Sequence, residues 1–77
     1  MADEPEPADV AQIAAIDAIL ERYDPEDIDD LDVTARFVDG ELTIDVYLLV
    51  EGEDTADAVT EAVEAATAAV DELLEEA

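Results

Sequence analysis

Carboxylates are the reactive side chains that this chain has in quantity. It contains 25 Asp and Glu residues against two basic residues in a length of 77, so its formal net charge is −23. Two carboxyl groups can act as general acid and general base when both are positioned on a substrate. At this density, however, pairs arise by chance at almost any spacing. No pair therefore indicates an active site.

The acidic run at residues 24–32 has the composition of a calcium loop without its spacing. An EF-hand loop needs oxygen ligands at alternate positions, a glycine at the sixth position and a glutamate at the twelfth. Counting from Asp27, Leu31 occupies a ligand position and Asp32 occupies the glycine position. We therefore expect no metal site.

Several other chemistries are excluded because their residues are missing. The chain has no histidine, serine, cysteine or lysine, and Gly40 and Gly52 are its two glycines. Ser-His and Cys-His nucleophiles, Schiff bases, disulfides and zinc sites with histidine or thiolate ligands are thus ruled out. A phosphate-binding glycine loop is absent too, and so is the serine that an acyl carrier protein needs. We expect no catalytic residue, no cofactor and no small-molecule substrate, so the protein is not expected to be an enzyme.

The acidity has three possible explanations. A carboxylate surface stays hydrated in a salty cytoplasm, where the Debye length falls to about 3 Å and like charges stop repelling each other. The other two are mimicry of nucleic acid, which would occupy a basic protein, and calcium buffering. Both of these predict clustered acids, whereas the acids here follow the solvent-facing positions of the whole chain. Salt adaptation is the favoured explanation, and direct binding of nucleic acid is not expected.

The chain also has no apolar run of transmembrane length, and its first seven residues are acidic rather than basic. They do not form a signal peptide. We expect a cytoplasmic protein with no membrane contact.

The stretch from Leu31 to Glu51 predicts two strands joined at Asp39-Gly40. Asp-Gly between alternating apolar runs favours a two-residue type I′ turn. This turn fixes the register and places eight apolar residues on one face: Leu31, Val33, Ala35, Phe37, Leu42, Ile44, Val46 and Leu48. On the other, mostly polar face, Tyr47 and Leu49 are either scattered surface residues or a contact patch.

Helical periodicity precedes and follows the hairpin. Residues 1–7, with two prolines, are expected to form a disordered acidic leader, and residues 8–77 are expected to form a single α+β domain. In the first helix the expected inner stripe is Val10, Ile13, Ile16 or Asp17, Leu20 and Tyr23, widened by Ile19. In the second it is Val59, Val63, Ala66, Val70, Leu73 and Ala77, a heptad stripe that packs either on the sheet or on another chain.

The predicted fold class is therefore α+β, in two layers with the order helix-strand-strand-helix. Both helices cover one face of the antiparallel hairpin. Two strands are marginal alone, and one small core seldom contributes more than about 3–5 kcal/mol. With no disulfide or metal, association is the remaining source of stability. The strand at residues 41–51 is expected to have a free edge that another subunit can extend.

The hairpin sequence from Leu31 to Leu48 resembles a small archaeal protein family of unknown function that is common in haloarchaea. The acidic leader, the alanine-rich first helix and the segment from Ala69 to Leu73 match this pattern as well. The chain is also similar to the small Pcc-type subunits of the KEOPS complex, which makes the threonylcarbamoyl modification of tRNA. Those subunits are non-catalytic, dimerise and dock on the catalytic subunit. Their helical docking surface implies an interface at Val59, Val63, Ala66 and Val70.

Together these features predict a non-catalytic protein–protein interaction module of a halophilic archaeon. It would act as a homodimer or with another protein partner, as an accessory subunit of a KEOPS-like complex. The alternatives are an acidic mimic of nucleic acid, or a domain with no role in a complex.

Salt adaptation makes a direct prediction about folding. In dilute buffer the carboxylates repel one another, so we expect the fold to loosen or unfold there and to recover in molar potassium chloride. Far-ultraviolet circular dichroism across a salt titration measures this. A spectrum that stays constant over the whole range would contradict it.

Overall fold

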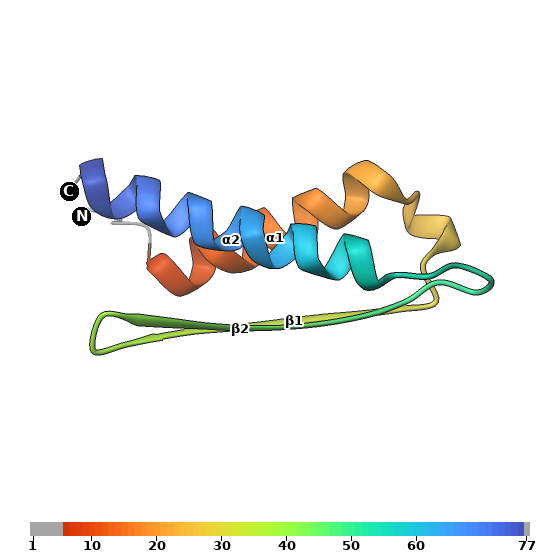
Figure 1. The fold of residues 1–77 in the computed structure, drawn as a ribbon, viewed down its shortest axis with the longest axis horizontal. Coiled ribbons are helices and arrows are strands. Elements are labelled where there is room, and N and C mark those ends of the chain that lie inside the picture. The colour runs from red at the N-terminus through yellow and green to blue at the C-terminus, as the bar shows by residue number, and fades with distance from the viewer. Residues whose placement is uncertain (1–5, 77) are drawn as a thin grey trace.

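The computed structural model describes residues 6–76 and has the predicted order of elements (Figure 1). Helix α1 spans Pro7–Arg22, strand β1 spans Asp30–Val38, strand β2 spans Glu41–Leu49 and helix α2 spans Ala56–Glu76. A short 3₁₀ turn, η1, spans Pro25–Asp27. The predicted α+β class is confirmed. Of the predicted leader, residues 1–5 lie outside the described residues, as does Ala77 of the second stripe.

The register of the hairpin agrees with the prediction at every pair. Val38 faces Glu41, and the ladder continues to Asp30 opposite Leu49. Asp39 and Gly40 have φ values of 54° and 80°, as a type I′ turn requires. Aspartate tolerates the left-handed region and glycine has no Cβ to clash there, so this dipeptide closes the turn with little strain.

The ends of both helices follow local sequence signals. Helix α1 begins at Pro7, one residue earlier than periodicity suggested, because proline fits the first helical position with its preset φ. At the start of α2, Asp54 Oδ1 accepts a hydrogen bond from the Ala56 backbone N–H at 3.0 Å. Neither helix within the described residues combines the length and apolarity that crossing a membrane would require.

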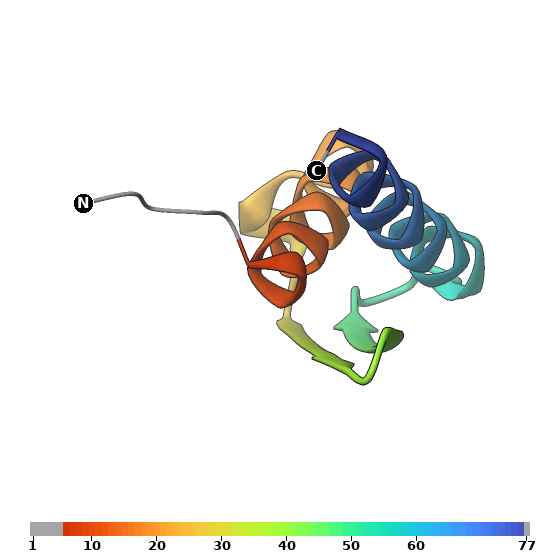
Figure 2. The same ribbon diagram turned by 90° about the vertical axis from the view of Figure 1, so that its left-hand side faces the viewer.

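The two helices form one layer and the hairpin forms the other. Figure 1 shows both helices on the same side of the strands, and Figure 2 shows them side by side, α1 over β1 and α2 over β2. The outer face of the hairpin has no covering element within residues 6–76. This arrangement matches the two-layer prediction.

The helix faces that are buried differ from those predicted. The seam between α1 and α2 is made mainly of small residues and is fully buried: Ala11, Ala15 and Ile19 of α1, and Ala58, Ala62, Ala66 and Val70 of α2. Two residues of the predicted α1 stripe, Ile13 and Leu20, are exposed, and Ile13 is 61% exposed. In α2, Val59 and Val63 are half-buried. The predicted stripes were therefore wrong in part, although Ile19, Ala66 and Val70 were placed correctly.

Helix–helix packing explains the difference. Each helix contacts the other helix more extensively than it contacts the sheet. Alanine at four-residue spacing lets two backbones approach closely, since the interaxial distance depends on the side chains at the contact. Ile13 and Leu20, which lie off this row, are exposed to solvent. On the outside of the seam, Arg22 Nη1 donates to Glu61 Oε2 at 2.6 Å, an exposed pair worth about 0–1 kcal/mol.

The core is apolar throughout and thin. None of the buried residues in the described part of the chain is polar or charged. Of the eight inner-face residues of the hairpin, Val33 and Leu48 are buried and the other six are half-buried. Much of the hairpin's apolar face is thus only partly shielded from solvent.

The alanine seam predicts a sharp effect of side-chain size. Replacing Ala62 by leucine inserts three extra carbon atoms between the helices and should destabilise the fold by about 1–3 kcal/mol. The matched control is Ala68→Leu, on the exposed face of the same helix. Urea unfolding in molar potassium chloride measures both variants. If the two variants were equally stable, Ala62 would not be packed between the helices as described.

Candidate interaction surface

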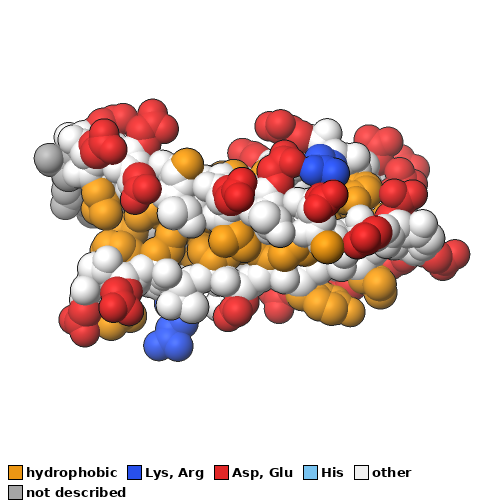
Figure 3. Space-filling view, viewed as in Figure 1, with side chains coloured by type: hydrophobic (Ala, Val, Ile, Leu, Met, Phe, Trp, Pro, Cys, Tyr) orange, Lys and Arg blue, Asp and Glu red, His pale blue; other side chains and the backbone are white. Residues whose placement is uncertain are grey.

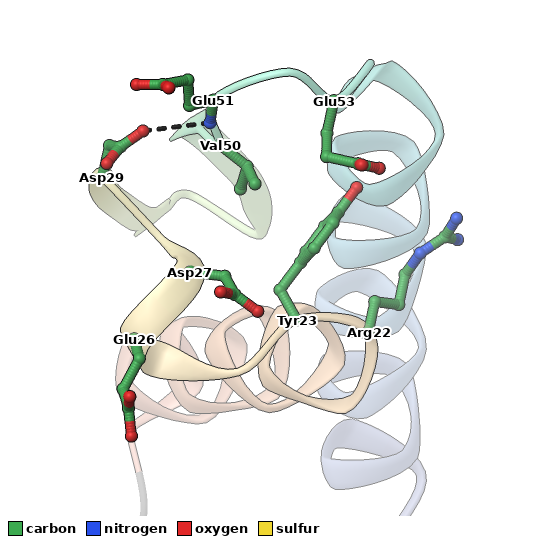
Figure 4. A pocket seen from close by; sticks show the side chains of 8 residues that line it. All are labelled: Arg22, Tyr23, Glu26, Asp27, Asp29, Val50, Glu51 and Glu53. Atoms are coloured by element: carbon green, nitrogen blue, oxygen red, sulfur yellow. Dashed lines mark hydrogen bonds between the residues drawn. The ribbon is translucent and has the colours of Figure 1, made fainter.

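One hollow lies at the end where α1, the connector and the β2–α2 loop meet, and it has a volume of about 570 Å³ (Figure 4). Tyr23 leans into it with its hydroxyl directed toward Glu53, and Asp29 Oδ2 accepts a hydrogen bond from the Glu51 backbone N–H at 3.0 Å. The surrounding carboxylates are exposed side chains on a wide, open rim.

The described residues also provide no metal site. Among residues 6–76 no group of three or more acidic side chains is arranged to hold a cation. A second, smaller hollow of about 340 Å³ lies on the outer face at the hairpin tip, beside Arg36 and Glu41. The surface features that remain are the backbone edges and the apolar side chains of the hairpin.

The turn determines which backbone groups of the strands point outward. A two-residue turn makes Val38 and Glu41 a hydrogen-bonded pair, and hydrogen-bonded pairs alternate with non-hydrogen-bonded ones along the ladder. The backbone N–H and C=O groups of the non-hydrogen-bonded pairs therefore point away from the partner strand. On β1 these are Leu31, Val33, Ala35 and Phe37, and on β2 they are Leu42, Ile44, Val46 and Leu48.

Two side-chain hydrogen bonds agree with this assignment and make the edges unequal. Gln12 Nε2 of α1 donates to the Val33 carbonyl at 2.9 Å and so occupies the middle of the β1 edge. Thr55 Oγ1 donates to the Leu48 carbonyl at 3.2 Å, at the end of the β2 edge. Leu42, Ile44 and Val46 therefore form a continuous row of outward backbone groups with no other strand beside them in residues 6–76.

Apolar side chains line the space between α2 and this edge. Figure 3 shows a band of hydrophobic atoms between the acid-covered helix layer and the hairpin along this side of the molecule. Leu42, Ile44 and Val46 are half-buried, as is Val63 of α2. We call this region, formed by the β2 backbone edge and the adjoining apolar band, the β2 edge.

The predicted interface residues divide into three groups. Tyr47 and Leu49 are exposed on the outer face of β2, at 54% and 48%. Val59 and Val63 are half-buried on α2. Ala66 and Val70 are buried in the chain's own core, so they offer no surface to a partner. This burial follows from the alanine seam, which takes up the inner part of the heptad stripe.

Sequence reasoning misplaced two apolar side chains and did not identify which residues of the free edge have outward backbone groups. Periodicity placed Ile13 and Leu20 inside, whereas both are exposed. The outward groups of Ile44 and its neighbours could have been found, because the Asp39-Gly40 turn already fixes their direction. The signal was the alternation of hydrogen-bonded and non-hydrogen-bonded pairs along the two strands, rather than any side-chain motif.

Comparisons with known proteins give one informative relationship. No protein-family model and no solved structure matches the chain. An uncharacterized protein of Natronomonas pharaonis is 49% identical over 77 residues, which cover 95% of this chain and 93% of that protein. The chain belongs to this haloarchaeal protein family.

Membership of the haloarchaeal family bears on the composition. The identity extends over nearly the whole length of both proteins, so it includes the helices as well as the hairpin. A relative from a salt-loving archaeon accords with salt adaptation as the source of the net charge of −23.

Amide hydrogen exchange can test the open β2 edge. In single-copy protein in molar potassium chloride, we expect the amides of Leu42, Ile44 and Val46 to exchange fast. Those of Thr43 and Asp45 should exchange slowly, because they bond to β1. These alternate residues of the same strand are the internal control, and NMR resolves both sets. Equal protection of the two sets would show that the edge is not open.

Proposed function

We propose that this protein is a non-catalytic interaction module of a haloarchaeon that completes its two-stranded sheet by binding another protein chain. The observation that supports this is the β2 edge, a row of unpaired backbone groups beside an apolar face that is only half-buried. A two-stranded sheet is marginal in water. A bound chain would add backbone hydrogen bonds and cover apolar surface at the same time.

The proposed setting is the cytoplasm, within a homodimer or a complex with a different protein. The similarity of the hairpin to Pcc-type subunits supports a more specific role as an accessory subunit of a KEOPS-like tRNA-modification complex. Pcc-type chains tend to have a strand ahead of the first helix, whereas the first element in residues 6–76 is α1. Such a role would rest on docking to a protein, since a surface of this charge repels RNA phosphates.

Mimicry of nucleic acid is the second candidate, and the density of carboxylates on the surface favours it (Figure 3). The two candidates differ in how binding responds to salt. Contacts made by backbone hydrogen bonds and apolar burial persist in molar salt, whereas contacts between carboxylates and a basic protein weaken steeply as the Debye length shrinks.

Purification from a haloarchaeal host tests the proposal. We expect a tagged copy, isolated in molar potassium chloride, to have a mass by light scattering that exceeds one chain. Mass spectrometry then identifies the associated protein, and the KEOPS catalytic subunit would support the more specific role. A folded chain of single-copy mass, both in the native extract and when pure at micromolar concentration, would refute the proposal. Association that disappears in molar salt would favour mimicry instead.

A further inference from the structure

We infer that the β2 edge binds one extended segment of a different protein, in which apolar residues alternate with basic ones. This inference rests on the proposed function and specifies the partner. Three observations support it: the width of the helix layer, the row of outward backbone groups and the charges on the outer face of β2.

The helix layer is wider than the sheet beneath it. Figure 2 shows α1 and α2 side by side over the two strands. The axes of packed helices are about 8–10 Å apart, whereas paired strands are about 5 Å apart. With α1 over β1 and α2 over β2, the axis of α2 therefore lies beyond β2, toward the position that a further strand would take. The space under α2 beside β2 suits a single extended segment.

A second copy of this chain does not fit the same space. Symmetric pairing of two β2 strands would put the two-fold axis about 2.4 Å beyond β2, half a strand spacing. This two-fold axis is perpendicular to the sheet, so it passes through the region that α2 occupies. Rotation about it would place the α2 helix of the second copy in nearly the same position as the first. A segment without its own helix layer avoids this clash.

The backbone of the edge can hold such a segment. Leu42, Ile44 and Val46 each offer one N–H donor and one C=O acceptor in alternate positions, the pattern that an added strand pairs with. The β1 edge is a poorer site, because the Gln12 side chain already bonds to the Val33 carbonyl at its centre. The β2 edge is therefore the preferred side for strand addition.

The inner side of the added strand requires apolar residues. In antiparallel pairing, residues directly opposite one another have their side chains on the same face of the sheet. The residues facing Leu42, Ile44 and Val46 would thus lie under α2, on the half-buried apolar side of the sheet. Aliphatic side chains such as valine or isoleucine would fill this band and cover the atoms visible in Figure 3.

The outer side of the added strand favours basic residues. Glu41 and Asp45 lie on the exposed outer face of β2 with Thr43 between them, and Tyr47 follows. An acidic residue opposite either carboxylate would be unfavourable, whereas arginine or lysine would pair with it. The long stem of a basic residue can also pack on the exposed Tyr47 ring.

A synthetic peptide with the sequence RVRIRVR and blocked ends tests this inference in molar potassium chloride, where nonspecific charge attraction is screened. At millimolar peptide, we expect amide exchange of Leu42, Ile44 and Val46 to slow by about tenfold or more, with no change at Leu31, Ala35 and Phe37 of the β1 edge. The control peptide RRVIVRR has the same composition without the alternation, and it should give no protection.

Two matched variants of the protein show whether the peptide binds the β2 edge or the β1 edge. The substitution Ile44→Pro removes an outward N–H without breaking the ladder to β1, and it should abolish protection of Leu42 and Val46. Proline at Ala35, the residue opposite, makes the same change on the β1 edge and should leave peptide binding intact. Circular dichroism in molar salt checks that both variants fold.

The inference is overturned by no protection of the wild-type edge, by equal protection from the control peptide, or by protection of the β1 edge. If the peptide does not protect the β2 amides while the native chain still purifies as an assembly, the proposed function stands and the inference of an extended basic segment is wrong. If no assembly exists either, both are wrong. A native assembly of two identical chains whose β2 amides are protected would show that the occupant is a second copy.

Discussion

Close contact between the two helices through small side chains is the interaction on which this structure depends. The hairpin alone is two strands wide and would be marginal in water. It gains stability from a helix layer, and that layer exists because alanines at four-residue spacing bring α1 and α2 together. Ile13 and Leu20 remain exposed, and most of the inner face of the hairpin is half-buried. The packing of the two helices therefore stabilises the hairpin without fully covering its apolar face.

The register of the hairpin could be predicted from sequence because short-range rules determine it, although β2 ends at Leu49, two residues before the predicted end of the strand. Asp39-Gly40 demands positive φ at both positions, and the turn then fixes every later pair. The helix faces could not be predicted as well. Apolar periodicity gives weight to Ile and Leu and little to alanine, so Ile13 was placed inside while Ala11 and Ala15 were overlooked. Which helix face is buried depends on how closely the neighbouring helix approaches, and this is a tertiary property.

A free strand edge as the candidate site could be predicted from the sequence, whereas the residues that form the site were predicted less well. A free edge on the second strand was expected, and the strand has no partner other than β1 within the described residues. Tyr47 and Leu49 are exposed on that strand, whereas Ala66 and Val70 belong to the helix seam. The inequality of the two edges depends on Gln12, a polar residue on α1 that bonds across 21 positions to Val33. A contact of this separation leaves no periodic signature in the sequence.

The composition of the core has a thermal consequence. Among residues 6–76, five of the ten buried residues are alanine and none of the ten is polar. Unfolding therefore exposes little apolar area for a chain of this length, and the heat-capacity increment, which follows that area, is correspondingly small. A small increment makes the curve of stability against temperature shallow, with gradual losses on both warming and cooling. For such a molecule we expect the folded fraction to change gradually with temperature rather than over a narrow range.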